Sequence, residues 1–201
     1  MVRKTIAFIG IDGAGKTTII NEIEKILKKQ GIKCKRRYMG LGREYDLRII
    51  EKLIQIYRRL KRGKSDKRKS ADLPGHNYRQ RGFFWVAVQY LELWARHIKS
   101  RFNKSEVTLF DRYFYDGLIL TNRRSFNFFR FITPKPTKAF LLYSKPKVIR
   151  SRKKEARIKD IKEFYMRFNR LKSKFDIEII DNNKNLKEVV KEIVKKIKWV
   201  L

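Results

Sequence analysis

The chain has 201 residues, of which 42% are hydrophobic and 36% are charged, enough for one domain with a sizeable core. Lysine and arginine number 52 against 20 aspartates and glutamates, a formal net charge of +32. This charge reflects either a compositional bias toward lysine or a partner that is acidic or bears phosphates. Cys34 is the only cysteine, which excludes an internal disulfide, and no apolar run approaches the length of a membrane span. We therefore expect a single cytoplasmic domain, residues 1–201.

The first part of the chain alternates apolar runs with helical patterns. The continuous apolar run Thr5–Ile11 predicts a strand buried on both faces. Apolar residues at helical spacing then predict a helix over Thr17–Lys29, which Gly31 ends. The more polar segment Ile32–Met39 predicts a second strand nearer the edge of the sheet. This alternation favours an α/β layer fold with a parallel sheet.

The middle of the chain is more helical and more basic. Apolar residues on one face predict helices over Tyr45–Leu60 and Phe83–Ile98. Between them, residues 58–81 carry ten lysines and arginines against Asp66 and Asp72, without apolar periodicity, so we expect a basic mobile loop. Two interpretations of this loop remain open: it follows a nucleic-acid backbone, or it is simply a solvated segment.

The rest of the chain completes the predicted sheet. Three short apolar runs predict buried strands: Val107–Phe110, Ala139–Tyr143 and Ile177–Ile180. Residues 147–174, between the last two strands, are predicted to be helical and are very basic. Leu186–Leu201 is an amphipathic pattern that predicts a closing helix, with Asn185 as its N-cap.

A phosphate-binding motif joins the first strand to the first helix. Gly10-Ile11-Asp12-Gly13-Ala14-Gly15-Lys16-Thr17 fits the pattern G-x-x-x-x-G-K-[ST], the P-loop. Glycines let the backbone aim successive N–H groups at phosphate oxygens, and the helix start adds its positive end. Lys16 is expected to reach the β- and γ-phosphates, and the Thr17 hydroxyl to bind Mg²⁺. We therefore expect a P-loop NTPase with a five-stranded parallel sheet flanked by helices, in which residues from Gly10 to Thr18 bind ATP–Mg²⁺.

Three segments, in the same order and spacing, resemble the thymidylate kinase family. Phe8–Thr18 is similar to its F-E-G-[IL]-D-G-[AS]-G-K-[ST]-T opening, and Asp111-Arg112-Tyr113 is similar to its D-R-Y motif. Ile180-Asp181-Asn182 and the helix that follows resemble its C-terminal I-D-A segment. The resemblance implies a nucleoside monophosphate kinase fold, ATP and Mg²⁺ as cofactors, transfer to dTMP foremost, and a homodimer.

Two residues after the third strand are candidates for the reaction centre. Asp111 ends a buried strand, where open α/β sheets bind ligands, so it is a candidate Mg²⁺ ligand together with Thr17. Arg112 presents a fork suited to phosphate, and the resemblance assigns it to the acceptor phosphate. The resemblance also implies that the Asp12 side chain faces a hydroxyl group of the acceptor sugar.

A catalytic arginine is expected outside the P-loop. Ala14 stands where an arginine of the loop's own would lie, so the resemblance implies a closing basic lid, residues 147–174, that supplies one. The family's P-x₅-R pattern matches Pro146 and Arg152, with Arg150 and Arg157 as alternatives.

The acceptor half departs from the family pattern. Ile9 replaces a glutamate, and Arg37-Tyr38-Met39-Gly40-Leu41-Gly42-Arg43 stands where the family has R-E-P-G-G-T. The candidates for the acceptor site are Arg37 or Arg43 for its phosphate, Trp85 and Gln89 for its base, and Tyr113, which either shapes the pocket or packs. Two alternatives to a nucleoside monophosphate kinase therefore stay open. One is a kinase of a polynucleotide end or a sugar, and the other is a nucleic-acid-binding P-loop ATPase.

Overall fold

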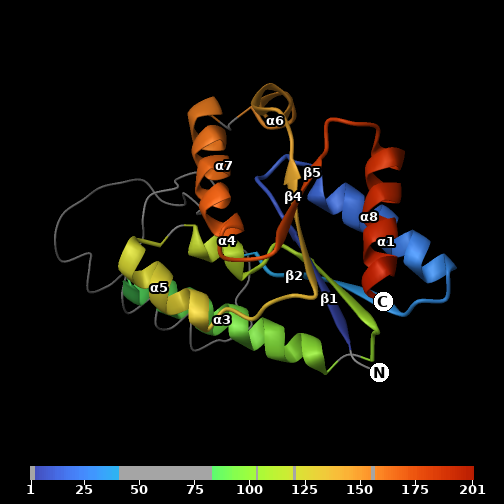
Figure 1. Ribbon diagram of the computed structural model, residues 1–201, viewed down its shortest axis with the longest axis horizontal. Helices are drawn as coiled ribbons and strands as arrows, with labels where there is room; N and C mark the ends of the chain where they lie inside the picture. Colours follow the sequence, from blue (N-terminus) through green and yellow to red (C-terminus); the bar gives the residue numbers. More distant parts are fainter. Residues whose placement is uncertain (1–2, 41–82, 103, 120, 155–156) are drawn as a thin grey trace.

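The computed structural model describes residues 3–40, 83–102, 104–119, 121–154 and 157–201. Within these ranges a five-stranded sheet has the order β2-β3-β1-β4-β5, and every neighbouring pair is parallel (Figure 1). The strands are β1 (Lys4–Ile9), β2 (Cys34–Tyr38), β3 (Val107–Asp111), β4 (Lys138–Tyr143) and β5 (Ile177–Asp181). The predicted five-stranded parallel sheet is confirmed.

The burial of each strand follows its sequence. β1 lies at the centre of the sheet, where residues 6–9 are fully buried, in agreement with its continuous apolar run. β2 is an edge strand with three charged residues, and most of its side chains are exposed or half-buried. Phe8 pairs with Asp111 in β3 and with Phe140 in β4, so the carboxyl ends of these three strands lie at the same end of the sheet. The candidate site lies at these strand ends.

Helices cover both faces of the sheet (Figure 1). The described helices are α1 (Lys16–Lys29), α3 (Phe83–Arg101), α4 (Phe114–Leu118), α5 (Arg123–Phe131), α6 (Pro146–Arg152), α7 (Ile158–Lys172) and α8 (Leu186–Val200). α1 and α8 lie together on one side of the sheet, and α3, α4, α5 and α7 lie on the other. None of the helices in the described ranges is long and apolar enough to cross a membrane.

α8 shows how an amphipathic pattern becomes a packed helix. Its apolar residues form one buried face: Val189, Val190, Ile193, Val194 and Ile197. Asn185 is the N-cap, and its side-chain oxygen accepts a hydrogen bond from the Lys187 backbone N–H at 2.9 Å. Both features follow the prediction from the sequence.

Two parts of the chain differ from the prediction. Residues 147–174 do not form one helical segment, because α6 ends at Arg152 and α7 begins only at Ile158. α4 and α5 were not predicted, since α4 is too short to show a helical period and only Ser125 and Phe129 of α5 are buried. The predicted helix over 45–60 and the basic loop over 58–81 lie outside the described residues.

Candidate active site

The P-loop (residues 10–17) turns sharply between β1 and α1. Gly13 and Gly15 have φ angles of 89° and 83°, in the left-handed region that residues with a Cβ atom rarely adopt. A Cβ atom at Gly15 would also lie 2.8 Å from Nδ2 of Asn182. Both glycines are therefore required by the turn itself, and Gly15 is also required by the close approach of the segment after β5.

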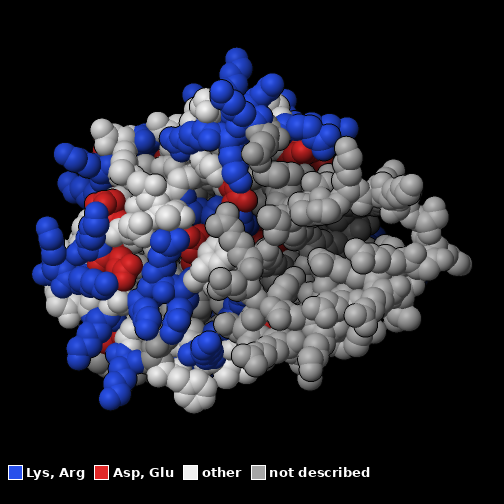
Figure 2. All heavy atoms as spheres, turned by 180° about the vertical axis from the view of Figure 1, so that it is seen from behind, with Lys and Arg blue, Asp and Glu red and all other residues white. Residues whose placement is uncertain are grey.

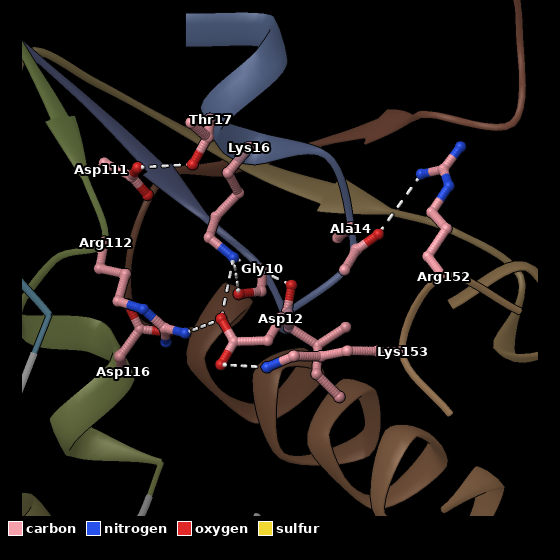
Figure 3. A network of polar contacts seen from close by, with 12 residues as sticks. Gly10, Asp12, Ala14, Lys16, Thr17, Asp111, Arg112, Asp116, Arg152 and Lys153 are labelled. Atoms are coloured by element: carbon pink, nitrogen blue, oxygen red, sulfur yellow. Dashed lines mark hydrogen bonds and ion pairs between the residues drawn. The ribbon is translucent and has the colours of Figure 1, made fainter. Parts of the chain in front are cut away.

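Lys16 is buried inside this turn (Figure 3). Its Nζ donates hydrogen bonds to the carbonyl oxygens of Gly10 at 2.7 Å and Ile11 at 2.9 Å, and lies 3.9 Å from Oδ1 of Asp12. Burial is the main cause, and repulsion from Arg112 the second, of a Lys16 pKa that is lowered to about 8. The attraction of Asp12 acts in the opposite direction. The ammonium is therefore fixed at the loop and sensitive to mildly alkaline pH.

Nucleotide affinity is expected to fall above pH 8. Bound phosphate favours the ammonium form, so it raises the pKa of Lys16 above the value of about 8 in the nucleotide-free protein. The complex then holds more protons than the free protein, and affinity is full below pH 8 and is lost as pH rises through it. Calorimetric titration with ATP should show about tenfold weaker binding at pH 9 than at pH 7. A Lys16→Ala variant should bind weakly without this step, and constant wild-type affinity from pH 7 to 9 would contradict the assignment.

Thr17 and Asp111 form the candidate metal pair. The Thr17 hydroxyl donates a hydrogen bond to Oδ2 of Asp111 at 3.2 Å, across the junction of α1 and β3 (Figure 3). Asp111 is buried at the carboxyl end of its strand. A hydroxyl and a carboxylate are hard oxygen donors, and Mg²⁺ is commonly held by one or two such groups together with phosphates, so the pair fits the metal. Among the described residues there is no group of three or more His, Cys, Asp or Glu that could hold a metal by itself.

Arg112 lies between two carboxylates at the start of the loop after β3. Its Nη2 contacts Oδ1 of Asp12, and its Nη1 lies 3.7 Å from Oδ1 of Asp116 (Figure 3). Arg112 is the only non-glycine residue in the described ranges with a positive φ, at 71°. Residues held in this region cluster at functional sites, where the surrounding structure fixes them.

The two carboxylates beside Arg112 respond differently to their surroundings. Burial opposes ionisation of Asp12, but Arg112, Lys16 and Lys153 together hold its pKa below the usual value. Burial raises the pKa of Asp116 despite the attraction of Arg112, and its Oδ2 accepts a hydrogen bond from the Tyr113 backbone N–H at 3.1 Å. Asp12 is thus a stable anion, and Asp116 is the carboxylate more ready to take a proton.

The last residue of α6 and the residue after it bring two further cations to the P-loop. Nη1 of Arg152 donates to the carbonyl oxygen of Gly13 at 3.3 Å, and Nζ of Lys153 lies 3.7 Å from Oδ2 of Asp12 (Figure 3). Of the two alternatives to Arg152, Arg150 is exposed on α6, and Arg157 pairs with Asp160 of α7 at 2.8 Å. The geometry therefore favours Arg152 as the cation nearest the loop, and its catalytic role stays a prediction.

The predicted acceptor residues that the structure describes come from β2, from α3 and from the residue before α4. Arg37 is half-buried on β2, and Gln89 is buried on α3. Tyr113 is 1% exposed and packs against the rings of Phe110, Phe114 and Tyr115. Burial raises the pKa of its phenol. Arg43 and the side chain of Trp85 lie outside the described residues. The acceptor roles of these residues remain predictions, and for Tyr113 packing is the role that its surroundings support.

Sequence reasoning did not assign four side chains to this site. They are Asp116, described above, and Asn182, Arg36 and Lys153. Nδ2 of Asn182 donates to the carbonyl oxygen of Ala14 at 2.6 Å, which ties the segment after β5 to the P-loop. Arg36 contacts Asp111, and Lys153 contacts Asp12. Asn182 directly follows a predicted strand, so its place at the ligand edge could have been inferred. Nothing in the local sequence distinguishes Arg36 or Lys153 from the many other basic residues.

The sheet order, the P-loop and the crossover helices place the chain in the P-loop NTPase fold. Similar solved structures include deoxyadenosine kinase from M. mycoides with products dCMP and a flexible dCDP bound. It is 17% identical over 96% of this chain and 98% of that chain, with a TM-score of 0.57. The same kinase with bound dATP is 17% identical over 96% and 99% of the two chains, with a TM-score of 0.54. No family model and no curated protein matches the sequence. At this identity, the likeness establishes the fold.

Proposed function

We propose that this chain is an ATP-dependent phosphotransferase that passes the γ-phosphoryl group of ATP to a nucleoside monophosphate, dTMP foremost. One observation carries the proposal: a buried lysine lies within the P-loop, and Arg112 reaches the loop's Asp12 from the end of the neighbouring strand. The first group suits the phosphates of ATP, and the second suits an anion that approaches from the acceptor side.

The residues of the chain would act mainly by binding and positioning. The P-loop N–H groups and Lys16 would hold the β- and γ-phosphates, and Arg152 would stabilise negative charge on the group in transfer. Thr17 and Asp111 would hold Mg²⁺, which when bound neutralises charge on the phosphates. Arg112, held beside Asp12, would orient the acceptor.

An acceptor that already carries a phosphate suits the charges of the site. Transfer to a hydroxyl group needs a base to take its proton, whereas a phosphate oxygen is already anionic and needs cations. Asp12 is a poor base because its pKa is lowered, and Asp111 is in contact with Arg36. The arginine between Asp12 and Asp116 is the group that a monophosphate would meet.

A deoxynucleoside is the second candidate acceptor. The similar kinase from M. mycoides is a deoxyadenosine kinase, bound to dATP in one structure and to dCMP and dCDP in another. Asp116 supports this candidate, because burial raises its pKa and so makes it a better base than Asp12. In that case Asp116 would accept the proton of the acceptor hydroxyl.

The charge of the chain favours a third acceptor, the end of a polynucleotide. Figure 2 shows Lys and Arg side chains gathered over the side of the molecule where α1 and α8 lie. Helix α8 alone has four exposed lysines: Lys187, Lys191, Lys195 and Lys198. Such a surface attracts phosphate backbones, with an affinity that falls as salt rises.

A screen of ATP consumption tests these candidates. The purified protein with ATP and Mg²⁺ is offered dTMP, the other nucleoside monophosphates, deoxynucleosides, a 5′-hydroxyl oligonucleotide and sugars, and ADP is measured. We expect ADP formation that depends on a monophosphate, with dTMP preferred. Turnover only with deoxynucleosides or only with the oligonucleotide would replace the proposed acceptor. Failure to bind ATP at all would remove the proposed function.

A further inference from the structure

The guanidinium of Arg36 lies within the candidate metal pair. Its Nη2 is 2.5 Å from Oδ2 of Asp111 and 3.4 Å from Oγ1 of Thr17. The Thr17 hydroxyl donates to the same Asp111 oxygen at 3.2 Å. A positive charge supplied by the chain itself therefore lies where the hydroxyl and the carboxylate would meet a metal ion.

The fold gives Arg36 a second partner on α1. Its Nη1 donates to Oδ1 of Asn21 at 2.9 Å, and Asn21 lies one helical turn beyond Thr17. Arg36 belongs to the edge strand β2, and its side chain is 28% exposed, whereas that of Asp111 is only 3% exposed. The arginine can thus leave the carboxylate toward solvent and keep its contact with Asn21.

We infer that Arg36 is a tethered cation that competes with the divalent metal for Asp111 and Thr17. The inference rests on the proposed function, because the metal would arrive with the nucleotide. A guanidinium and a divalent ion compete for Oδ2 of Asp111, because two cations that close together repel each other. Metal binding therefore requires Arg36 to give up a short, charge-assisted hydrogen bond.

The competition has a measurable consequence for nucleotide binding. In the wild type without metal, Arg36 keeps a positive charge near the phosphates and so supports nucleotide binding. With metal present, Arg36 competes with the ion for Asp111 and so reduces the affinity that the ion adds. Nucleotide affinity should therefore depend only weakly on Mg²⁺. Removal of the side chain should strengthen the dependence about tenfold, the factor expected from the loss of one charge-assisted hydrogen bond.

The experiment measures ADP binding by calorimetry in excess EDTA and in excess Mg²⁺. The quantity compared is the dissociation constant in EDTA divided by the dissociation constant in Mg²⁺. It compares the wild type, Arg36→Gln and Arg36→Lys. Lys35→Gln is the matched control, because it removes one positive charge from the next position of the same strand. A thermal melt of each variant checks its folding.

We expect the ratio to rise about tenfold in Arg36→Gln and to stay at the wild-type value in Lys35→Gln. Arg36→Lys should fall between them, since an ammonium lacks the fork that reaches Asp111 and Asn21 together. An unchanged or smaller ratio in Arg36→Gln would overturn the inference and leave the proposed function standing, because ADP would still bind. A wild type that binds ADP in neither condition would overturn the proposed function itself.

Discussion

Replacing Lys16 with alanine is expected to lower ATP turnover by about a thousandfold while the fold is retained. The Lys16 ammonium is buried at the P-loop and is the charge best placed to follow the γ-phosphoryl group as negative charge moves during transfer. A missing charge at such a preorganised position is felt more strongly in the transition state than in the ground state. ADP formation should be measured with the best acceptor from the screen, and folding by circular dichroism.

The matched control for this variant is Lys25→Ala. Lys25 lies on the same helix, and its side chain is exposed and paired with Glu22 at 2.7 Å. Its removal should leave turnover within about twofold of the wild type, since surface ion pairs contribute little. Retention of wild-type turnover in Lys16→Ala would show that the P-loop does not take part in the reaction.

Replacing Arg112 with alanine is expected to lower kcat/KM for the acceptor by about 100- to 1,000-fold, with a much smaller change in ATP affinity. Arg112 contacts the Asp12 side chain, whereas Lys16 is held by the carbonyl oxygens of the loop (Figure 3). Its loss also leaves Asp12 and the buried Asp116 facing each other without the cation between them. We therefore expect a lower melting temperature as well.

Steady-state kinetics in both substrates separates these effects. The KM for the acceptor should rise in Arg112→Ala, whereas ATP binding measured by calorimetry should change little. Arg124→Ala is the control, because Arg124 is exposed on α5. Equal losses of acceptor and ATP binding would remove the proposed role of Arg112 and assign it to the support of the P-loop.

The sheet could be predicted from the sequence because its information is local. Each central strand is a short apolar run that ends where the chain turns, and the P-loop motif fixes which strand precedes which helix. The edge position of β2 followed from its charges, and Asn185 followed from the capping rule. The fold class and the position of the P-loop between β1 and α1 could therefore be predicted from the sequence alone.

The contacts around the site were not accessible in the same way. Arg36 meets Asp111 only because β2 lies beside β3, and Asn182 meets Ala14 only because β5 brings it back to the first loop. The break between α6 and α7 and the short helix α4 leave no periodic signal. In a chain with 52 lysines and arginines, composition does not show which basic side chains lie at the candidate site and which are exposed elsewhere.

The central position of β1 has a consequence for biosynthesis. β1 is made first, yet its two neighbours in the sheet are Val107–Asp111 and Lys138–Tyr143. At about 5–20 residues per second, the ribosome leaves this apolar strand without its partners for several seconds or longer. Asn182, which fastens Ala14, is translated later still. Until residues 138–143 have been made, the nascent chain therefore carries an incomplete P-loop site and unpaired strand edges, and in this period a chaperone would protect it from aggregation.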